Sequence, residues 1–236
     1  MCNQEDDEVR KLGIKYVNNL DVKPYSTPTF EVTEKGSRVK YNEQWYDWKI
    51  FGAHNLQNAM GALELAQAIG ISPSDFMLAM QDFTGAGKRL QKVVEVADFV
   101  LFKDFAHSPS KLKATTKAVK EQYPDRNVIA CMELHTFSSL QKNFLPHYNG
   151  AMEAADVALV YYSPAVVAHK KLPELSKSEV ESAFGNGVHV VNETQEVLEF
   201  IKNQDLYNSV LLMMSSGTFD GIDYDKLGEE LVESLD

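Results

Sequence analysis

The sequence predicts an α/β protein in two parts: a Rossmann-like domain with a mostly parallel sheet, preceded by a smaller part with a β meander and helices. From Arg89 onward, near-continuous apolar runs alternate with helical segments, which is typical of parallel strands covered on both faces. Before that point, short segments of alternating apolar and polar residues are separated by turn residues, which indicates antiparallel strands. We therefore expect a boundary near residue 87, between domains at 1–86 and 87–236.

The first part should contain three strands and two helices. The first fifty residues favour short β segments, with strands expected at 29–33, 37–41 and 45–50. A helix is expected over 55–69, because an apolar series with a 3.6-residue period ends at Gly70. Ser72 as N-cap and Pro73 at the first helical position predict a second helix that runs to about residue 83.

Five apolar runs predict the strands of the second part. They cover residues 99–102, 128–132, 157–161, 188–191 and 210–214. Helix-start signals stand between them, with Ser108-Pro109 as one example. Ligands of such sheets bind beyond the carboxyl ends of the strands, so the residues that follow each run are the candidates for a site.

Composition and charge exclude several classes of protein. The 236 residues are 44% hydrophobic, which is ordinary for a folded protein, and no apolar run is long enough to span a membrane. The acidic start lacks the layout of a signal peptide, and Cys131 lies in an apolar run as a reduced core residue, so we expect a cytoplasmic protein. The net charge of −11 without a basic block argues against nucleic acid as a partner.

Two predicted strand ends carry polar residues that could bind a ligand. Asp104 and His107 follow one strand and could hold ribose hydroxyls, a metal or a phosphate, although a strand-end Asp and an exposed His are an equally good interpretation. Ser215-Ser216-Gly217 follows the last strand. Its backbone N–H groups could face an anion, or it could be a plain turn.

The first part and the joint offer further candidates. Asn55 and Asn58 share a face at a helix start and could contact an adenine edge, although a helix cap and a solvated Asn are the more common reading of that spacing. Arg89 could reach a phosphate when two domains close, or be a solvated linker charge. The stretch 85–88 lacks the spacing of a Walker A loop, so no phosphate-cradling loop is expected in the chain.

Taken together and in this order, these motifs resemble the Mur ligase family over nearly the whole chain. Residues 54–59, His-Asn-Leu-Gln-Asn-Ala, resemble the helix that ends the family's central domain. Residues 85–90 resemble its Gly-x-x-Arg-Leu joint, and residues 104–109, Asp-Phe-Ala-His-Ser-Pro, resemble the motif that follows. Residues 2–6 look like an Asn-x-Asp-Asp stretch that precedes a helix in the central domain.

The resemblance implies the carboxyl-terminal part of a ligase that activates a carboxylate of UDP-N-acetylmuramate with ATP and Mg²⁺, forms an acyl phosphate and transfers it to an amine. The implied ATP contacts are His54, Asn55, Asn58, Arg89 and Asp104. The implied acceptor contacts are His107, His135, Ser215, Ser216 and Gly217, and His107 and Arg89 would be catalytic. The phosphate loop, the metal ligands and the sugar domain should precede Met1, so this chain alone is expected to be inactive.

Within the family, the similarity is greatest to the ligase that adds the peptide L-alanyl-γ-D-glutamyl-meso-diaminopimelate during peptidoglycan recycling. Residues 215–221, Ser-Ser-Gly-Thr-Phe-Asp-Gly, resemble its Ser-Asn-Gly-Gly-Phe-Asp-Gly turn. The alternative is the L-alanine ligase, but Thr136 and Ser139 replace the two arginines of its Pro-His-Arg-Tyr-Thr-Arg segment. A non-catalytic binding module that kept the fold is a third possibility.

Overall fold

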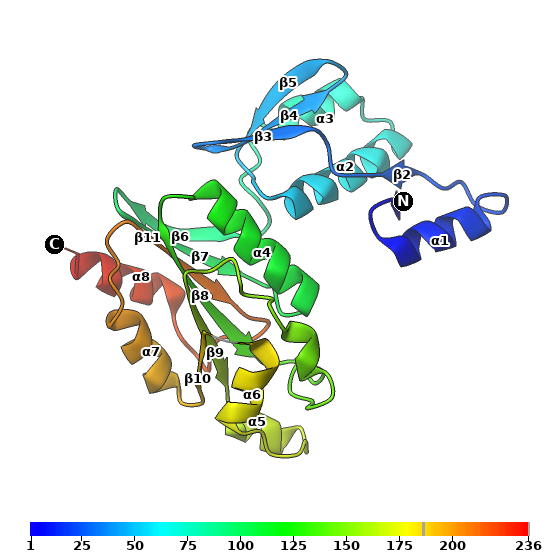
Figure 1. Ribbon diagram of the computed structural model, residues 1–236. Helices are drawn as coiled ribbons and strands as arrows, with labels where there is room; N and C mark the ends of the chain where they lie inside the picture. The colour runs from blue at the N-terminus through cyan, green and yellow to red at the C-terminus, as the bar shows by residue number, and fades with distance from the viewer. Residues whose placement is uncertain (186, 236) are drawn as a thin grey trace. The chain divides into compact units, whose positions relative to one another are not determined.

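The computed structural model describes residues 1–185 and 187–235 and divides into two compact units, Met1–Gly85 and Ala86–Asp236 (Figure 1). Each unit has its own hydrophobic core. Among the described residues, no helix is both long and apolar enough to cross a membrane.

The second unit is built on a six-stranded sheet of order β10-β9-β8-β11-β7-β6, in which β6 alone is antiparallel to its neighbour. The strands are β6 (Gln91–Val96), β7 (Phe99–Asp104), β8 (Asn127–Leu134), β9 (Val157–Tyr162), β10 (Val188–Val191) and β11 (Ser209–Met214). The last strand, β11, lies between β7 and β8, with Met214 opposite both Asp104 and Met132. All six residues of β11 are buried, as a central parallel strand requires.

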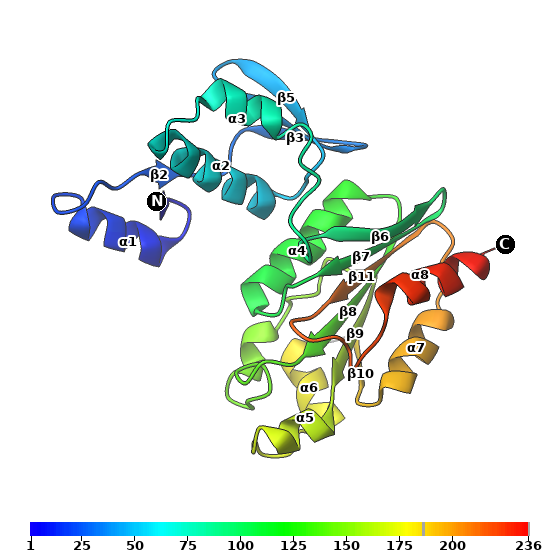
Figure 2. The same cartoon turned by 180° about the vertical axis from the view of Figure 1, so that it is seen from behind.

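Helices cover both faces of this sheet (Figures 1 and 2). On one face lie α4 (Pro109–Gln122) and α6 (Lys177–Phe184), and on the other lie α7 (Thr194–Lys202) and α8 (Tyr224–Glu233). A short helix α5 (Pro164–His169) and a 3₁₀ turn η1 (Leu145–Tyr148) complete the connections. Val197 of α7 and Leu227 of α8 pack in one cluster with Leu101 and Leu211, so the strands are buried from that side by helices.

The first unit combines a small parallel pair with an antiparallel meander. Strands β1 (Cys2–Asn3) and β2 (Pro24–Tyr25) pair in parallel, and helix α1 (Asp7–Tyr16) lies in the connection between them. The meander consists of β3 (Phe30–Thr33), β4 (Gly36–Tyr41) and β5 (Gln44–Trp48), followed by α2 (Ala53–Ala68) and α3 (Pro73–Ala79). Leu56, Leu63 and Met77 pack against the meander, and the Trp48 indole donates to the Met77 carbonyl at 3.2 Å.

The predicted α/β class with a mostly parallel sheet is confirmed, with three differences. Residues 7–16 form α1, in line with the resemblance of residues 2–6 to a stretch that precedes a helix, and not one of the short β segments that the pattern favoured. Asp6 caps the backbone N–H of Val9, and acidic residues occupy the first turn. Strand β6 was missed, since its polar residues 91, 92 and 95 hide the pattern of an edge strand. Helix α3 ends at Ala79, about a turn before the expected position.

Candidate active site

The candidate site lies at the carboxyl ends of the three central strands of the second unit. The chain leaves β7 towards α4 on one face of the sheet and leaves β11 towards α8 on the opposite face. Connections that part in this way open a crevice at the strand ends, which is where open α/β sheets bind ligands. The structure brings Asp104 of β7, Glu133 of β8 and Ser215 after β11 to this edge.

Asp104 is buried and both of its carboxylate oxygens are engaged by backbone donors. Oδ2 accepts from the N–H of Leu90 at 2.6 Å, and Oδ1 accepts from the N–H of Ala106 at 2.7 Å. The Phe105 N–H donates to the carbonyl of Lys88 at 2.9 Å. Lys88 and Leu90 both have positive φ, of 59° and 40°, which side chains other than Gly rarely adopt. Asp104 therefore holds a strained joint in place through two backbone hydrogen bonds.

Glu133 is the centre of a second hydrogen-bond cluster. Its side chain is only 3% exposed, its Oε2 accepts from the Ser215 hydroxyl and from the Phe219 N–H at 2.8 Å, and its Oε1 faces His135 Nδ1 at 3.2 Å. The Gly217 N–H donates to the Ser215 hydroxyl at 2.6 Å. One buried carboxylate thus joins the segment after β8 to the turn after β11.

The turn at 215–219 is packed closely against that cluster. A Cβ atom at Gly217 would lie 2.8 Å from Glu133 Oε2 and 2.8 Å from His135 Nδ1, so this position requires glycine. Phe219 is fully buried and stacks on Tyr161 with ring centroids 5.9 Å apart. The Ser216 hydroxyl oxygen is buried without a hydrogen-bond partner among the described residues. The predicted acceptor residues 135 and 215–217 therefore lie together.

His107 lies in the loop after β7. Its Nδ1 is 2.8 Å from the Phe105 carbonyl, so Nδ1 carries the hydrogen in the neutral ring. The phenol of Tyr148 donates to the His107 carbonyl at 2.5 Å, which ties this loop to η1. The His107 ring is half-buried and packs edge-on against Phe105.

Arg89, the predicted phosphate ligand, is exposed at the joint. Its guanidinium lies 5.6 Å from the Phe105 ring centroid, a cation–π contact that leaves the donors of the guanidinium open to solvent. Lys88 and Lys103 lie nearby in a pocket of about 250 Å³ that also includes Asp104, Gly217 and Thr218. Cationic side chains therefore lie beside the turn after β11.

The predicted adenine contacts lie in the first unit, at the start of α2. The Asn55 side chain donates to the Phe51 carbonyl at 3.0 Å, so part of its amide stabilises the helix start. Asn58 is exposed on the following turn, and His54 is half-buried. Gln57, which the sequence did not single out, donates to Glu5 at 2.8 Å and accepts from Asn3 at 2.8 Å, and so fixes α2 to the end of β1.

Glu133 is a site residue to which the sequence analysis assigned no role, although it lies directly after the strand expected at 128–132, where ligands of such sheets bind. The signal was a single carboxylate at the end of an apolar run, which must find donors when it is buried. Tyr224 was missed altogether. Burial raises the pKa of its phenol, and the negative charge of Glu133 raises it further. In the structure Glu133 lies within β8 and Tyr224 begins α8, so neither residue follows a strand directly.

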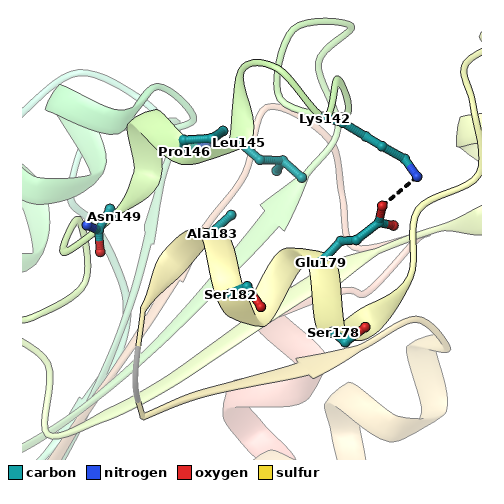
Figure 3. A pocket seen from close by; sticks show the side chains of 8 residues that line it. All are labelled: Lys142, Leu145, Pro146, Asn149, Ser178, Glu179, Ser182 and Ala183. Carbon is teal, nitrogen blue, oxygen red and sulfur yellow. Dashed lines mark hydrogen bonds and ion pairs between the residues drawn. The ribbon is translucent and has the colours of Figure 1, made fainter.

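Among the residues that the structure describes, no group of three His, Cys, Asp or Glu side chains could hold a metal ion. A separate pocket between η1 and α6 is lined by Leu145, Ser182 and the ion pair of Lys142 with Glu179, whose atoms are 2.6 Å apart (Figure 3). It contains none of the predicted site residues.

Comparison with known proteins adds sequence relatives. No protein-family model matches the chain. It is 24% identical, over an alignment of 238 residues, to a UDP-N-acetylmuramate–L-alanine ligase of Lactiplantibacillus plantarum, covering 96% of this chain and 52% of that protein. It is 30% identical over 191 residues to the enzyme of that name from Pelotomaculum thermopropionicum, covering 78% and 39%. The chain thus spans about half the length, or less, of these curated relatives.

Solved structures share the fold. The crystal structure of UDP-N-acetylmuramate–alanine ligase from Thermotoga maritima matches with a TM-score of 0.66 at 17% identity, covering 90% of this chain and 46% of that one. A murein peptide ligase from Psychrobacter arcticus matches with a TM-score of 0.58 at 19% identity, covering 96% and 49%. By its relatives and its fold, the chain belongs to the Mur ligase family and corresponds to the carboxyl-terminal part of these enzymes.

Proposed function

We propose that the chain supplies the acceptor-binding part of an ATP-dependent amide ligase that acts on UDP-N-acetylmuramate in the cytoplasm. The observation that carries this proposal is the meeting of three predicted elements at one strand edge. Asp104 ends β7 and His135 follows β8, the two strands on either side of β11, and the 215–217 turn follows β11 itself. Residues 1–86 would then be the end of an ATPase domain, and residues 87–236 the acceptor domain.

The reaction has two steps. The sugar carboxylate attacks the γ-phosphate of ATP to give an acyl phosphate and ADP. The acceptor amine then attacks the acyl carbon, loses a proton and expels phosphate, so the new C–N bond replaces the C–O bond. In this scheme His54, Asn55 and Asn58 contact the adenine, and Arg89 adds positive charge near the phosphates. Mg²⁺ would be bound outside the described residues.

We propose a peptide, L-alanyl-γ-D-glutamyl-meso-diaminopimelate, as the acceptor. A compact amino-acid carboxylate is best held by a bidentate guanidinium. The sequence of the second unit contains two arginines. Arg89 lies at the joint, and the Arg126 side chain donates to the carbonyl of Ala97, just before β7 begins. At the positions of the alanine ligase arginines, Thr136 and Ser139 hydrogen-bond to each other within their own loop. A longer acceptor can place its carboxylates on other cations, such as Lys103 in the crevice pocket.

L-Alanine is the second candidate. Both sequence relatives reported above are named alanine ligases, and this observation favours the single amino acid. The two candidates need cationic groups at different places in the crevice, because alanine has one carboxylate beside the reacting amine whereas the peptide has several distant ones.

A competition assay separates the two acceptors. It uses the complete ligase, which is this chain together with the region of the relatives that the chain does not match. With UDP-N-acetylmuramate, ATP and equal L-alanine and tripeptide, we expect kcat/KM to favour the tripeptide. Preference for alanine would establish the second candidate.

A second experiment tests the assignment to an incomplete catalytic unit. The chain as given should fold but release no phosphate from ATP in the presence of sugar and acceptor, because it contains no glycine-rich phosphate loop. Robust turnover by the chain alone would show that the ATP site has been misplaced.

A further inference from the structure

Glu133 is buried at the end of a central strand. Its neighbours along the strand are the apolar residues Met132 and Leu134, which are buried as well. A carboxylate at such a position is costly unless hydrogen bonds replace its lost hydration. Hydrophobic packing alone would favour an apolar residue here, so the carboxylate serves the groups that it contacts.

Those groups belong to both segments that the proposed function assigns to the acceptor. On one side the Ser215 hydroxyl and the Phe219 N–H donate to Oε2, and on the other His135 Nδ1 faces Oε1. Ser215 in turn accepts from the Gly217 N–H. The turn after β11 and the imidazole after β8 are thus fixed by the two oxygens of a single side chain.

The turn needs such a fixed point. Phe219 and Asp220 have positive φ, of 49° and 58°, in the left-handed region that is unfavourable for residues other than glycine. The hydrogen bond from the Phe219 N–H to Glu133 and the stacking of its ring on Tyr161 oppose that cost. Loss of the carboxylate would leave the strained backbone without its main polar contact.

The same carboxylate sets the hydrogen position on His135. An ionised Glu133 can only accept, so Nδ1 of the ring carries the hydrogen and Nε2 presents a lone pair. The His135 side chain is 38% exposed, and Nε2 has no partner among the described residues. The imidazole is therefore held with a defined edge available to a ligand.

We propose that Glu133 is the positioning residue of the acceptor site: it fixes the 215–219 turn and the orientation of His135 together, so that a polar acceptor meets a preformed cradle. This inference rests on the proposed function, because it assumes that these two segments contact the acceptor. It adds a residue that does not itself follow a strand and whose side chain is closed to solvent.

The test measures acceptor binding by the chain itself, monitored by chemical-shift titration with the tripeptide and, separately, with L-alanine. Glu133→Ala should weaken binding of the preferred acceptor by about ten-fold or more, since a 1.4 kcal/mol loss of preorganisation corresponds to that factor. Glu133→Gln keeps an oxygen for the turn but loses the charge, so its effect should be smaller. Ser215→Ala provides a second variant if Glu133→Ala does not fold.

Asp156→Ala is the matched control. Its carboxylate also accepts from the N–H of a neighbouring strand, Val128, at 2.8 Å and from the side chain of Lys120 at 2.7 Å, but it lies at the amino ends of the strands. It should lower the melting temperature and leave acceptor binding within about two-fold. In the complete ligase, Glu133→Gln should raise KM for the acceptor and leave KM for ATP unchanged.

The outcomes are distinct. If the wild-type chain binds neither acceptor, the proposed acceptor role fails and this inference fails with it. If the wild type binds and both Glu133→Gln and Ser215→Ala bind equally well, the proposed function stands and the positioning role is wrong. If Asp156→Ala weakens binding as much as Glu133→Ala does, Glu133 acts through stability alone and the inference is overturned.

Discussion

The two units both contain parallel strands connected through a helix, and they differ in how much those elements bury. In the second unit, β11 is buried at every residue, and Val197 and Ile201 of α7 lie fully inside the core. In the first unit, β1 and β2 have two residues each, and α1 buries none of its side chains. Parallel sheets are normally covered on both faces. The comparison separates structure supported by packing from structure supported by local interactions.

Local interactions are what stabilise α1. Asp6 caps its first turn, and the pairs Asp7–Arg10 and Glu8–Lys11 lie three residues apart on its exposed surface. A cap contributes about 1 kcal/mol and each exposed pair about 0.2–0.5 kcal/mol, whereas an isolated helix of this length is marginal in water. We therefore expect the β1–α1–β2 segment to open far more easily than the sheet of the second unit.

The largest expected contrast is in core truncation. Leu101→Ala in β7, where the side chain is fully buried, should lower the free energy of unfolding by about 3 kcal/mol. Leu12→Ala in α1, where the side chain is 55% exposed, should change it by less than about 0.5 kcal/mol. Urea unfolding followed by far-UV circular dichroism measures both. Similar losses for the two variants would mean that α1 is packed against something in solution.

The two cysteines provide a second contrast, one in each region. Both thiols are buried, and burial raises the pKa of Cys131 to about 12. Reaction therefore needs local opening, which should be easier around Cys2 in β1 than around Cys131 in β8. Under native conditions we expect iodoacetamide to label Cys2 at least about 100-fold faster. Mass spectrometry of peptides locates the label, and equal rates would contradict the difference in stability between the regions.

A kinetic contrast of intermediate size separates exposed candidate site residues of the two units. Arg89→Ala in the complete ligase should lower kcat about ten-fold, as the loss of a cation near the transition state does. Asn58→Ala should instead raise KM for ATP. Both side chains are exposed, so the melting temperatures should hardly change. A normal kcat with a lowered melting temperature would make Arg89 a structural linker residue.

The smallest expected effect concerns acid stability. Hydrogen bonds from Lys142 and from Ser176 lower the pKa of Glu179 to about 2. Because the folded pKa lies below the unfolded value of about 4.3, the stabilisation is present above that value and is lost as the pH falls towards about 2. Glu179→Gln should flatten the pH dependence of the second unit in this range. Trp45 and Trp48 are the two tryptophans and lie in the first unit, so their fluorescence should not respond.

Burial on both sides explains which elements could be predicted from the sequence. The five parallel strands were predicted because a strand covered on both faces is apolar at nearly every position. Strand β6 pairs on one side only, and its register shifts between Lys92 and Val94, so its residues show neither a run nor a clean alternation. Helix α1 has no fully buried residue, and the helical spacing of its apolar positions 9, 12 and 16 was passed over when the first fifty residues were interpreted as short β segments.

The site shows the same division. Asp104 and Ser215 were singled out because residues at the carboxyl ends of parallel strands meet at one edge. The sequence could not show that Asp104 uses both oxygens on backbone donors, since the left-handed joint at Lys88 and Leu90 has no signature in residue type. The role of Glu133 depends on a hydrogen bond to Ser215 across 82 positions of sequence, a pairing that only the fold reveals.

The position of β11 also has a consequence for biosynthesis. This strand is synthesised last of the six, yet it lies between β7 and β8. Until β11 is made, β7 and β8 lack the strand that joins them in the sheet. A nascent chain that has emerged only as far as α7 therefore holds two sheet fragments with facing unpaired edges, at β7 and β8. Such edges recruit other strands, so slow synthesis or premature termination before residue 209 should favour aggregation on the ribosome.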